Sequence, residues 1–176
     1  VQKALGEALA ACWDEDRFIR GIREDGVVVG AKKDPEASMW LNPQSWSVIS
    51  GFASKEQSDK AMQSVADILD TPYGAKLLDP PYIDNYFDGA LMHIFNPDTK
   101  ENGGIFSQSQ GWLILAESLL GHGDDAFRYF EESSPASMND KAEQRVLEPY
   151  VHGQFTESTA SPYAGRSHVH WLTGTA

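Results

Sequence analysis

Residues 105–130 read IFSQSQGWLILAESLLGHGDDAFRYF, and this segment carries the clearest signal of the fold class. Its first part is apolar on most faces, which is typical of a helix buried on all sides. The sequence Gly121-His122-Gly123 breaks that helix, and Asp124 is a favoured N-cap for a second, shorter one. The second helix carries apolar residues on one side and acidic residues on the other. We therefore predict a buried helix, a tight turn and an amphipathic helix.

The same order occurs earlier in the chain. Residues 43–53 mix small and apolar side chains on every face of a helix, with Pro43 as its first residue. Ser54 and Gln57 then form a capping-box pattern before a helix with a one-sided apolar stripe. Residues 1–18 have helical spacing too, and Asp25-Gly26 predicts a turn before a short β-branched run. Because strand signals are scarce, we predict an all-α fold in which helical hairpins surround an axis, with the buried helices inside.

Long loops lead into the helices, at residues 78–101 and 151–171, and they are rich in turn-forming residues. In a ring of hairpins the inner helices point their N-termini toward one rim, and helix N-termini attract anions. Long ordered loops in a compact domain are usually functional. We therefore expect a binding site at that rim.

The composition narrows the function classes. The chain of 176 residues has a net charge of −12 and no basic stripe, so we expect no nucleic-acid partner. No apolar run approaches the roughly 20 residues of a membrane span, and no signal peptide is visible. The single cysteine, Cys12, fits a reducing compartment, so we expect a cytoplasmic protein. The chain starts without Met and ends without charge, which suggests one partial domain, residues 1–176, truncated at both ends.

Five Trp, six Tyr and eight Phe suggest a carbohydrate partner, because aromatic rings stack on the C–H faces of sugars; core packing is the alternative. Three polar segments next to glycines are candidate binding sites, with ordinary turns and helix caps as the alternative for each. They are residues 96–108, with Lys100 and Glu101 before Gly103-Gly104; residues 148–154, with Gln154; and residues 171–176, with Thr173 and Gly174.

Other kinds of site lack support in the sequence. His168-x-His170 has no carboxylate or further histidine at a supporting spacing, so we expect no metal. Gly103-Gly104 is not followed by the Lys-Ser/Thr of a Walker motif, and no Gly-x-Ser-x-Gly elbow occurs. Cys12 has no neighbouring base and is a poor candidate for a nucleophile.

Five ordered blocks of the sequence resemble glycoside hydrolase family 94, the inverting phosphorylases of cellobiose, chitobiose, cellobionic acid and related β-glucosides. The resemblance begins at Trp13 and covers nearly the whole chain. The blocks are Arg17-x-x-Arg20-x-x-x-Glu24-Asp25-Gly26 and residues 40–51 (WLNPQSWSVISG), 100–106 (KENGGIF), 148–151 (EPYV) and 171–176 (WLTGTA). The resemblance implies an (α/α)6 toroid of the six-hairpin glycosidase type, of which this chain is a C-terminal part.

The resemblance also implies a reaction and its site residues. In the family, inorganic phosphate attacks the anomeric carbon of a disaccharide, here expected to be β-1,4-linked, while a carboxylic acid protonates the leaving oxygen and the configuration inverts. The implied partners are a disaccharide and phosphate, without a cofactor. Members are often dimeric, which allows for a homodimer of the full-length protein. By position, Lys100, Glu101 and Gln154 resemble glycone- and substrate-binding residues, and Gln108, Thr173 and Gly174 resemble phosphate-binding residues.

Two departures from the family pattern matter. Gln108 stands where the family usually has His, and an amide cannot carry the positive charge that strengthens a phosphate contact. The family's catalytic Asp and a phosphate-binding Arg precede the region that matches Val1. We therefore expect no catalytic residue in this chain, and we expect the chain alone to be inactive.

The sequence leaves alternatives open for the acceptor sugar and for the class of reaction. Some cellobiose enzymes have a Glu in the loop that corresponds to residues 82–95, and its absence here favours acceptors of the chitobiose or cellobionic acid type. An inverting hydrolase of the same toroidal class stays open because of Gln108. A non-catalytic sugar-binding relic stays open because the general acid is missing from these residues.

Overall fold

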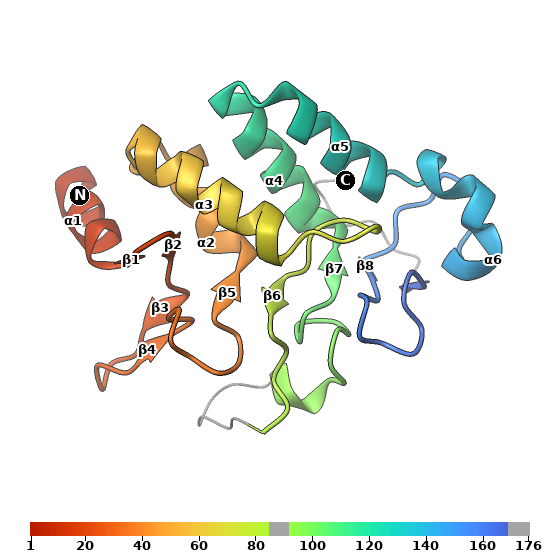
Figure 1. Cartoon of the computed structure of the whole chain (residues 1–176), viewed down its shortest axis with the longest axis horizontal. Coiled ribbons are helices and arrows are strands. Elements are labelled where there is room, and N and C mark those ends of the chain that lie inside the picture. The colour runs from red at the N-terminus through yellow and green to blue at the C-terminus, as the bar shows by residue number, and fades with distance from the viewer. Residues whose placement is uncertain (85–91, 169–176) are drawn as a thin grey trace.

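The computed structural model describes residues 1–84 and 92–168. Helices dominate this part of the chain, and short strands connect them (Figure 1). The α-helices are α1 (Gln2–Ala11), α2 (Leu41–Ile49), α3 (Lys55–Ile68), α4 (Ser107–Leu120), α5 (Gly123–Ser133) and α6 (Ala142–Arg145). The 3₁₀ helices are η1 (Met92–Ile94) and η2 (Ala136–Lys141). Within the described ranges, no helix is both long and apolar enough to cross a membrane.

Short antiparallel strands pair the loops between the helices. The pairs are β1 (Trp13–Asp14) with β2 (Arg17–Phe18), β3 (Gly21–Ile22) with β4 (Val28–Val29), and β5 (Met39–Trp40) with β6 (Leu78–Asp79). A further sheet has the order β7 (Ile105–Phe106), β8 (Phe155–Thr156) and β9 (Ser167–His168). The all-α prediction is therefore confirmed only in its coarser form, a mostly helical chain. Such strands are too short to show the alternating pattern that predicts a strand from sequence, which needs roughly four residues or more.

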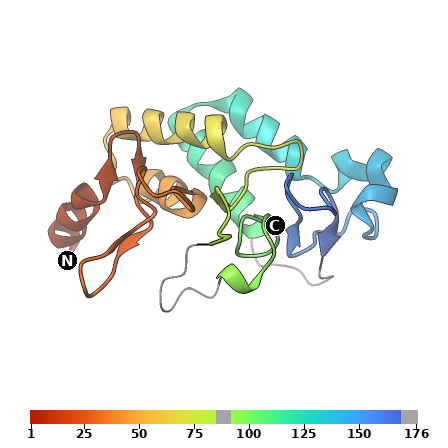
Figure 2. The same cartoon turned by 60° about the horizontal axis from the view of Figure 1, so that its bottom comes forward.

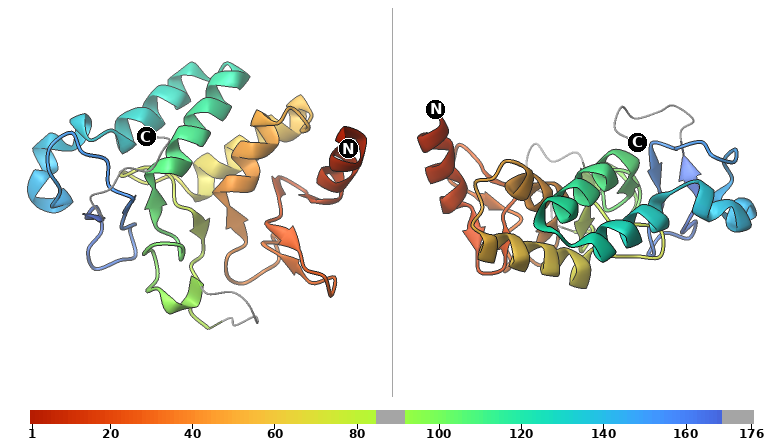
Figure 3. Two further views of the ribbon diagram at one scale, coloured as in Figure 1. Left: turned by 180° about the vertical axis from the view of Figure 1, so that it is seen from behind. Right: turned by 90° about the horizontal axis from the view of Figure 1, so that it is seen from above.

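The predicted helical hairpins are confirmed. Helices α2 and α4 lie side by side, and α3 and α5 return along their outer side (Figures 1 and 3). Both hydrogen bonds of the predicted capping box between Ser54 and Gln57 are present at the start of α3. Gly121 ends α4 in the left-handed conformation, with φ 82°, which glycine adopts without steric cost. The N-cap of α5 is His122 and not the predicted Asp124, because the His122 carbonyl already accepts the first helical bond from Ala126, at 3.0 Å.

The core lies between the two helical layers. Each of the helices α2 to α5 contributes side chains that are fully buried there. Among them are Leu41, Val65, Leu113 and Tyr129, all with 0% exposure. Because this packing fixes α2 against α4, the N-terminal ends of both helices meet on the side where the short strands gather (Figure 2).

Other boundaries differ from the prediction. The helix predicted over residues 1–18 ends at Ala11, and the chain then turns back through Glu15, with φ 62°, into the β1–β2 hairpin. That turn is fixed from a distance, because the backbone N–H of Phe18 donates to Gln44 Oε1 at 2.8 Å. Helix α2 begins at Leu41, before the predicted Pro43, and its first N–H donates to the Leu77 carbonyl at 3.0 Å.

The expectation that α2 and α4 are buried on all sides is wrong for the described residues. One face of this pair stays open because no described element covers it. The exposed apolar residues there are Trp46 at 47%, Leu115 at 46% and Leu119 at 59%. Trp46 and Trp112 pack edge to face on these helices, with ring centroids 5.3 Å apart. We call Trp46, Trp112, Leu115 and Leu119 the open apolar face.

Candidate functional site

The segment that carries Lys100 and Glu101 is a tight turn between η1 and β7. Its backbone is left-handed at Asp98, with φ 61°, and at Lys100, with φ 49°. The N–H of Gly104 donates to the Lys100 carbonyl at 2.8 Å and closes the turn. A Cβ atom at Gly104 would lie 2.6 Å from the oxygen of that carbonyl. The glycine is therefore required because the chain approaches itself at this turn.

Buried polar side chains hold this turn in place. Asn102, with 0% exposure, accepts a hydrogen bond from the Tyr82 N–H at 2.7 Å and donates to the carbonyls of Tyr82 and Phe95. Asp98, also with 0% exposure, lies 2.8 Å from the Lys76 ammonium through Oδ1 and accepts from the Ala160 N–H at 2.7 Å through Oδ2. The position of Lys100 therefore depends on Asp98, which precedes it, and on Asn102, which follows it in the turn.

The ammonium of Lys100 lies near two aromatic rings. Its Nζ is 5.5 Å from the ring centroid of Phe95 and 5.9 Å from that of Phe155, within the range of a cation–π interaction. Lys100 is half-buried. The rings restrict the ammonium, while its N–H groups can still donate hydrogen bonds to a ligand.

The β7–β8–β9 sheet brings Gln154 and Gln108 close to Lys100. Phe155 pairs with Phe106 across β7 and β8, and their ring centroids are 5.8 Å apart. The carbonyl of Gln154, next to Phe155, accepts a hydrogen bond from the N–H of Ser107 at 3.1 Å. Gln108 follows in the first turn of α4. The structure therefore places the segments that carry Lys100, Gln154 and Gln108 next to one another at the N-terminal end of α4.

Glu101 lies near the N-terminal end of α2. It is exposed and lines a groove together with Trp40, the N-cap of α2, and Asn42 in its first turn. The Ser109 hydroxyl donates to Asn42 Oδ1 at 3.1 Å, which joins the start of α4 to the start of α2. The predicted Thr173 and Gly174 lie outside the described residues, as does His170.

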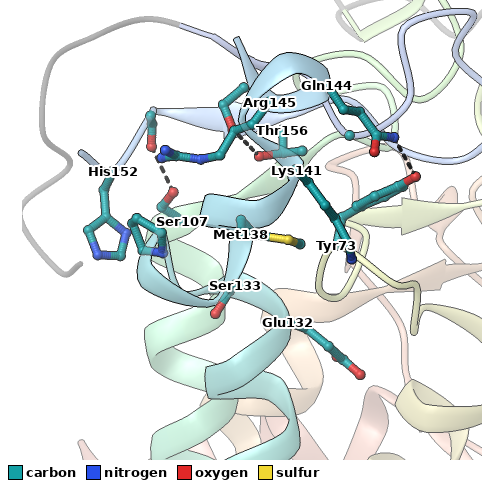
Figure 4. Close-up of a pocket in the computed structure, with 14 residues that line it drawn as sticks. Tyr73, Ser107, Glu132, Ser133, Met138, Lys141, Gln144, Arg145, His152 and Thr156 are labelled. Carbon is teal, nitrogen blue, oxygen red and sulfur yellow. Dashed lines mark hydrogen bonds between the residues drawn. The ribbon is translucent and has the colours of Figure 1, made fainter. Parts of the chain in front are cut away.

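Figure 4 shows a different cavity, between α5, η2, α6 and the β7–β8–β9 sheet. Its volume of about 30 Å³ has room for about one water molecule and not for a sugar. The hydroxyl of Ser107 donates to the Gly153 carbonyl at 2.7 Å, and Gln144 donates to the Tyr73 hydroxyl at 2.8 Å. Burial and the nearby Arg145 charge lower the pKa of His152, which favours the neutral ring. This cavity therefore belongs to the packing that supports the start of α4.

Two titratable clusters are not apparent in the sequence, because their members are distant along the chain or carry no motif. In the first, His168 Nε2 lies 2.7 Å from Glu157 Oε1, and the His168 ring stacks on Phe155. Glu157 also accepts hydrogen bonds from Thr99 and Ser161. His168, which we considered as a metal ligand, therefore supports the sheet beside Lys100.

The second cluster joins the two ends of the α4–α5 turn. Glu117, His122 and Asp125 have potential ligand atoms within 4.8 Å of one another. Glu117 is 2% exposed, its pKa is raised by burial, and its Oε2 lies 2.7 Å from His122 Nδ1. The Glu117–His122 contact therefore closes the turn, while Asp125 pairs with Arg128 at 3.3 Å.

Comparisons with known proteins identify what the chain is similar to. The model of a family described as "Glycosyl hydrolase 94 superfamily, catalytic domain" matches residues 2–176. The chain is 34% identical over 166 residues to an N,N'-diacetylchitobiose phosphorylase of Vibrio proteolyticus. It is 36% identical over 169 residues to a cellobionic acid phosphorylase of Neurospora crassa, and 32% identical over 164 residues to a solabiose phosphorylase of Paenibacillus borealis. Each alignment covers 93% of this chain and 21% of the relative, so the chain spans only that share of their length.

Proposed function

The chain belongs to the glycosyl hydrolase 94 superfamily, and on this premise we propose that it is part of the catalytic domain of an inverting disaccharide phosphorylase. In this reaction a phosphate oxygen forms a bond to the anomeric carbon while the bond from that carbon to the acceptor oxygen breaks. A carboxylic acid gives its proton to the leaving oxygen, and the configuration inverts. The products are a sugar 1-phosphate and an acceptor sugar.

The observation that carries this proposal is that the segments with Lys100, Gln154 and Gln108 lie next to one another at the N-terminal end of α4. Lys100 and Gln154 supply hydrogen-bond donors, and Gln154 also an acceptor, for the hydroxyls of the glycone. The first turn of α4 carries the positive end of the helix dipole, which favours an anion beside it. We assign phosphate to this end, with Gln108 donating through its amide and with Thr173 and Gly174 completing the phosphate site.

The open apolar face supports a larger ring of hairpins. Side chains of this size are normally covered when they gather on one face of a soluble domain. In an (α/α)6 toroid, neighbouring inner helices pack against α2 and α4 and cover that face. The general acid and a phosphate-binding arginine then come from residues that precede the matched region, as the family resemblance implies, and the isolated chain is inactive.

The proposed substrate is a β-1,4-linked disaccharide. The resemblance to the family supports this linkage, and the lack of a Glu in residues 82–95 favours an acceptor of the chitobiose or cellobionic acid type. Half of this loop, residues 85–91, lies outside the described residues.

The proposal is tested with the whole protein that carries this chain, incubated with cellobiose, chitobiose and cellobionic acid. We expect release of a sugar 1-phosphate that depends on added phosphate, detected by ³¹P NMR. Sugar release without phosphate would show a hydrolase instead. Binding of disaccharide without turnover under either condition would show a sugar-binding relic.

A further inference from the structure

The β7–β8–β9 sheet carries a row of aromatic rings that lie next to one another across the strands. Phe106 on β7 pairs with Phe155 on β8, and Phe155 pairs with His168 on β9. Direct cross-strand partners point to the same face of a sheet, so these rings share one face. The ring centroids of Phe106 and Phe155 are 5.8 Å apart, and those of Phe155 and His168 are 5.1 Å apart. We call Phe106, Phe155 and His168 the ring row.

The middle ring of the row has little freedom. Phe155 is 2% exposed, and its plane lies within 11° of the plane of the His168 ring. Because Phe106 and His168 flank it in the sheet, Phe155 keeps its orientation only while both neighbours stay in place. The Lys100 ammonium lies over the same ring, with Nζ 5.9 Å from the centroid. The orientation of Phe155 therefore affects where the ammonium rests.

Glu157 fixes the outer ring of the row. Its carboxylate is nearly buried, and Oε1 lies 2.7 Å from Nε2 of His168. Oε2 accepts hydrogen bonds from the hydroxyls of Thr99, at 3.3 Å, and Ser161. Thr99 directly precedes Lys100 in the chain. One carboxylate therefore contacts both the end of the ring row and the turn that carries Lys100.

The residues that hold Lys100 in this way lie outside the sequence blocks that resemble glycoside hydrolase family 94. Phe155, Glu157 and His168 stand between the blocks of residues 148–151 and 171–176. The resemblance assigns a role to Lys100 but none to these three residues. Their connection to Lys100 becomes apparent only in the fold.

A lysine at a sugar site gains from such restraint. Its ammonium sits on a flexible four-carbon stem, so fixing it when a ligand binds costs conformational entropy. Rings that hold the ammonium before the sugar arrives reduce this cost. A small displacement of a group that orients the substrate can also lower the rate strongly.

We propose that His168 is a positioning residue, which holds Phe155 in the orientation that fixes the Lys100 ammonium for a hydroxyl of the glycone. Glu157 keeps the His168 ring in place. This inference rests on the proposed phosphorylase function and adds to its sugar site a residue that acts through Lys100.

The first test compares two substitutions of His168 in the whole protein. The readout is kcat/KM in the synthetic direction, for whichever of glucose 1-phosphate and N-acetylglucosamine 1-phosphate the wild type uses as donor. His168→Phe keeps a ring against Phe155, and we expect it to retain at least about a third of the wild-type value. His168→Gln keeps a polar side chain but removes the ring, and we expect a roughly tenfold loss.

The matched control for this test is Ser167→Ala on the same strand. It removes the contact between the hydroxyls of Ser167 and Thr156, at 2.9 Å, which joins β8 to β9 on the other face of the sheet. The control should leave kcat/KM unchanged. A low value for His168→Phe together with a wild-type value for His168→Gln would overturn the role of the ring.

The second test asks whether His168 acts through Lys100. His168→Gln is combined with Lys100→Met, and we expect no further loss in this background, because residues that act through one contact are not additive. Deoxy analogues of the donor give an independent answer in the His168→Gln variant alone. The tenfold loss should disappear for the analogue that lacks the hydroxyl bound by Lys100 and persist for the others. An equal loss for every donor would show a general effect on the sheet and overturn the proposal.

The outcomes separate this inference from the proposed function. If the wild-type protein uses neither sugar 1-phosphate and phosphorolyses no disaccharide, the proposed function fails. If the wild type is active and His168→Gln matches it, only the role of His168 fails. Circular dichroism checks that each variant is folded, and His168→Leu, which also lacks a ring, replaces His168→Gln if that variant does not fold.

Discussion

At the scale of single residues, the turn around Lys100 depends on a buried ion pair. Lys76 is 6% exposed, and its ammonium contacts both Asp79 and Asp98. Oδ1 of Asp98 receives no other hydrogen bond, so the lysine charge is its compensation. We expect Lys76→Met to lower the free energy of unfolding of the chain by about 3–5 kcal/mol, because it leaves a buried carboxylate without its counter-ion.

Urea denaturation measures this loss. The control is Lys55→Met, which removes an exposed pair with Asp59 at 2.7 Å and costs less than about 1 kcal/mol. Equal effects of the two substitutions would contradict the role of Lys76.

Glu132 gives a prediction for pH dependence. Burial, and then the charge of Asp70, raise its pKa from 4.5 to about 7, against the opposing effect of Arg128. A raised carboxyl pKa means that the folded chain binds the proton more tightly than the unfolded chain. This contribution to stability is therefore lost as the pH rises from about 4.5 through about 7.

We expect Glu132→Gln to flatten the fall of the urea midpoint over this pH range. Glu131→Gln, at the exposed neighbouring position on α5, should keep the wild-type slope. If the urea midpoint fell with pH at the same slope in the wild type and both variants, Glu132 would be excluded as the origin of the pH dependence.

At the scale of elements, the helical hairpins were predictable and the loops were not. Helix periodicity and capping are local, so α3, α4 and the Gly121 turn follow from adjacent residues. The strands depend on pairing between distant segments, such as Phe106 with Phe155, which no local pattern contains. The same reason explains the candidate site: the roles of Lys100 and Gln154 came from a family resemblance, whereas the contact of Lys100 with the rings of Phe95 and Phe155 needed the fold.

The packing of α4 gives a prediction for an element. Leu113 is 0% exposed between the helical layers, so Leu113→Ala leaves a cavity that the neighbours cannot fill. We expect a loss of about 2–5 kcal/mol in the free energy of unfolding. In the isolated chain, Leu119→Ala at 59% exposure should cost much less, and both values come from the same urea experiment.

At the scale of the whole molecule, the exposure of the open apolar face distinguishes the isolated chain from the toroid that we propose. Leu115 and Leu119 are exposed in the described residues. The proposed ring of hairpins would bury both side chains. We therefore expect Leu119→Ser to change the melting temperature of the isolated chain little and to lower that of the whole protein by several degrees. An equally small effect in both would contradict a toroid that covers this face.

The most direct measurement of the central claim is a crystal structure of the whole protein with a disaccharide and phosphate or a phosphate mimic. We expect the Lys100 ammonium and the Gln154 side chain within about 3 Å of hydroxyls of the same sugar ring, with the anion at the N-terminal end of α4. A disaccharide bound elsewhere, or Lys100 and Gln154 facing separate surfaces, would contradict the proposed site.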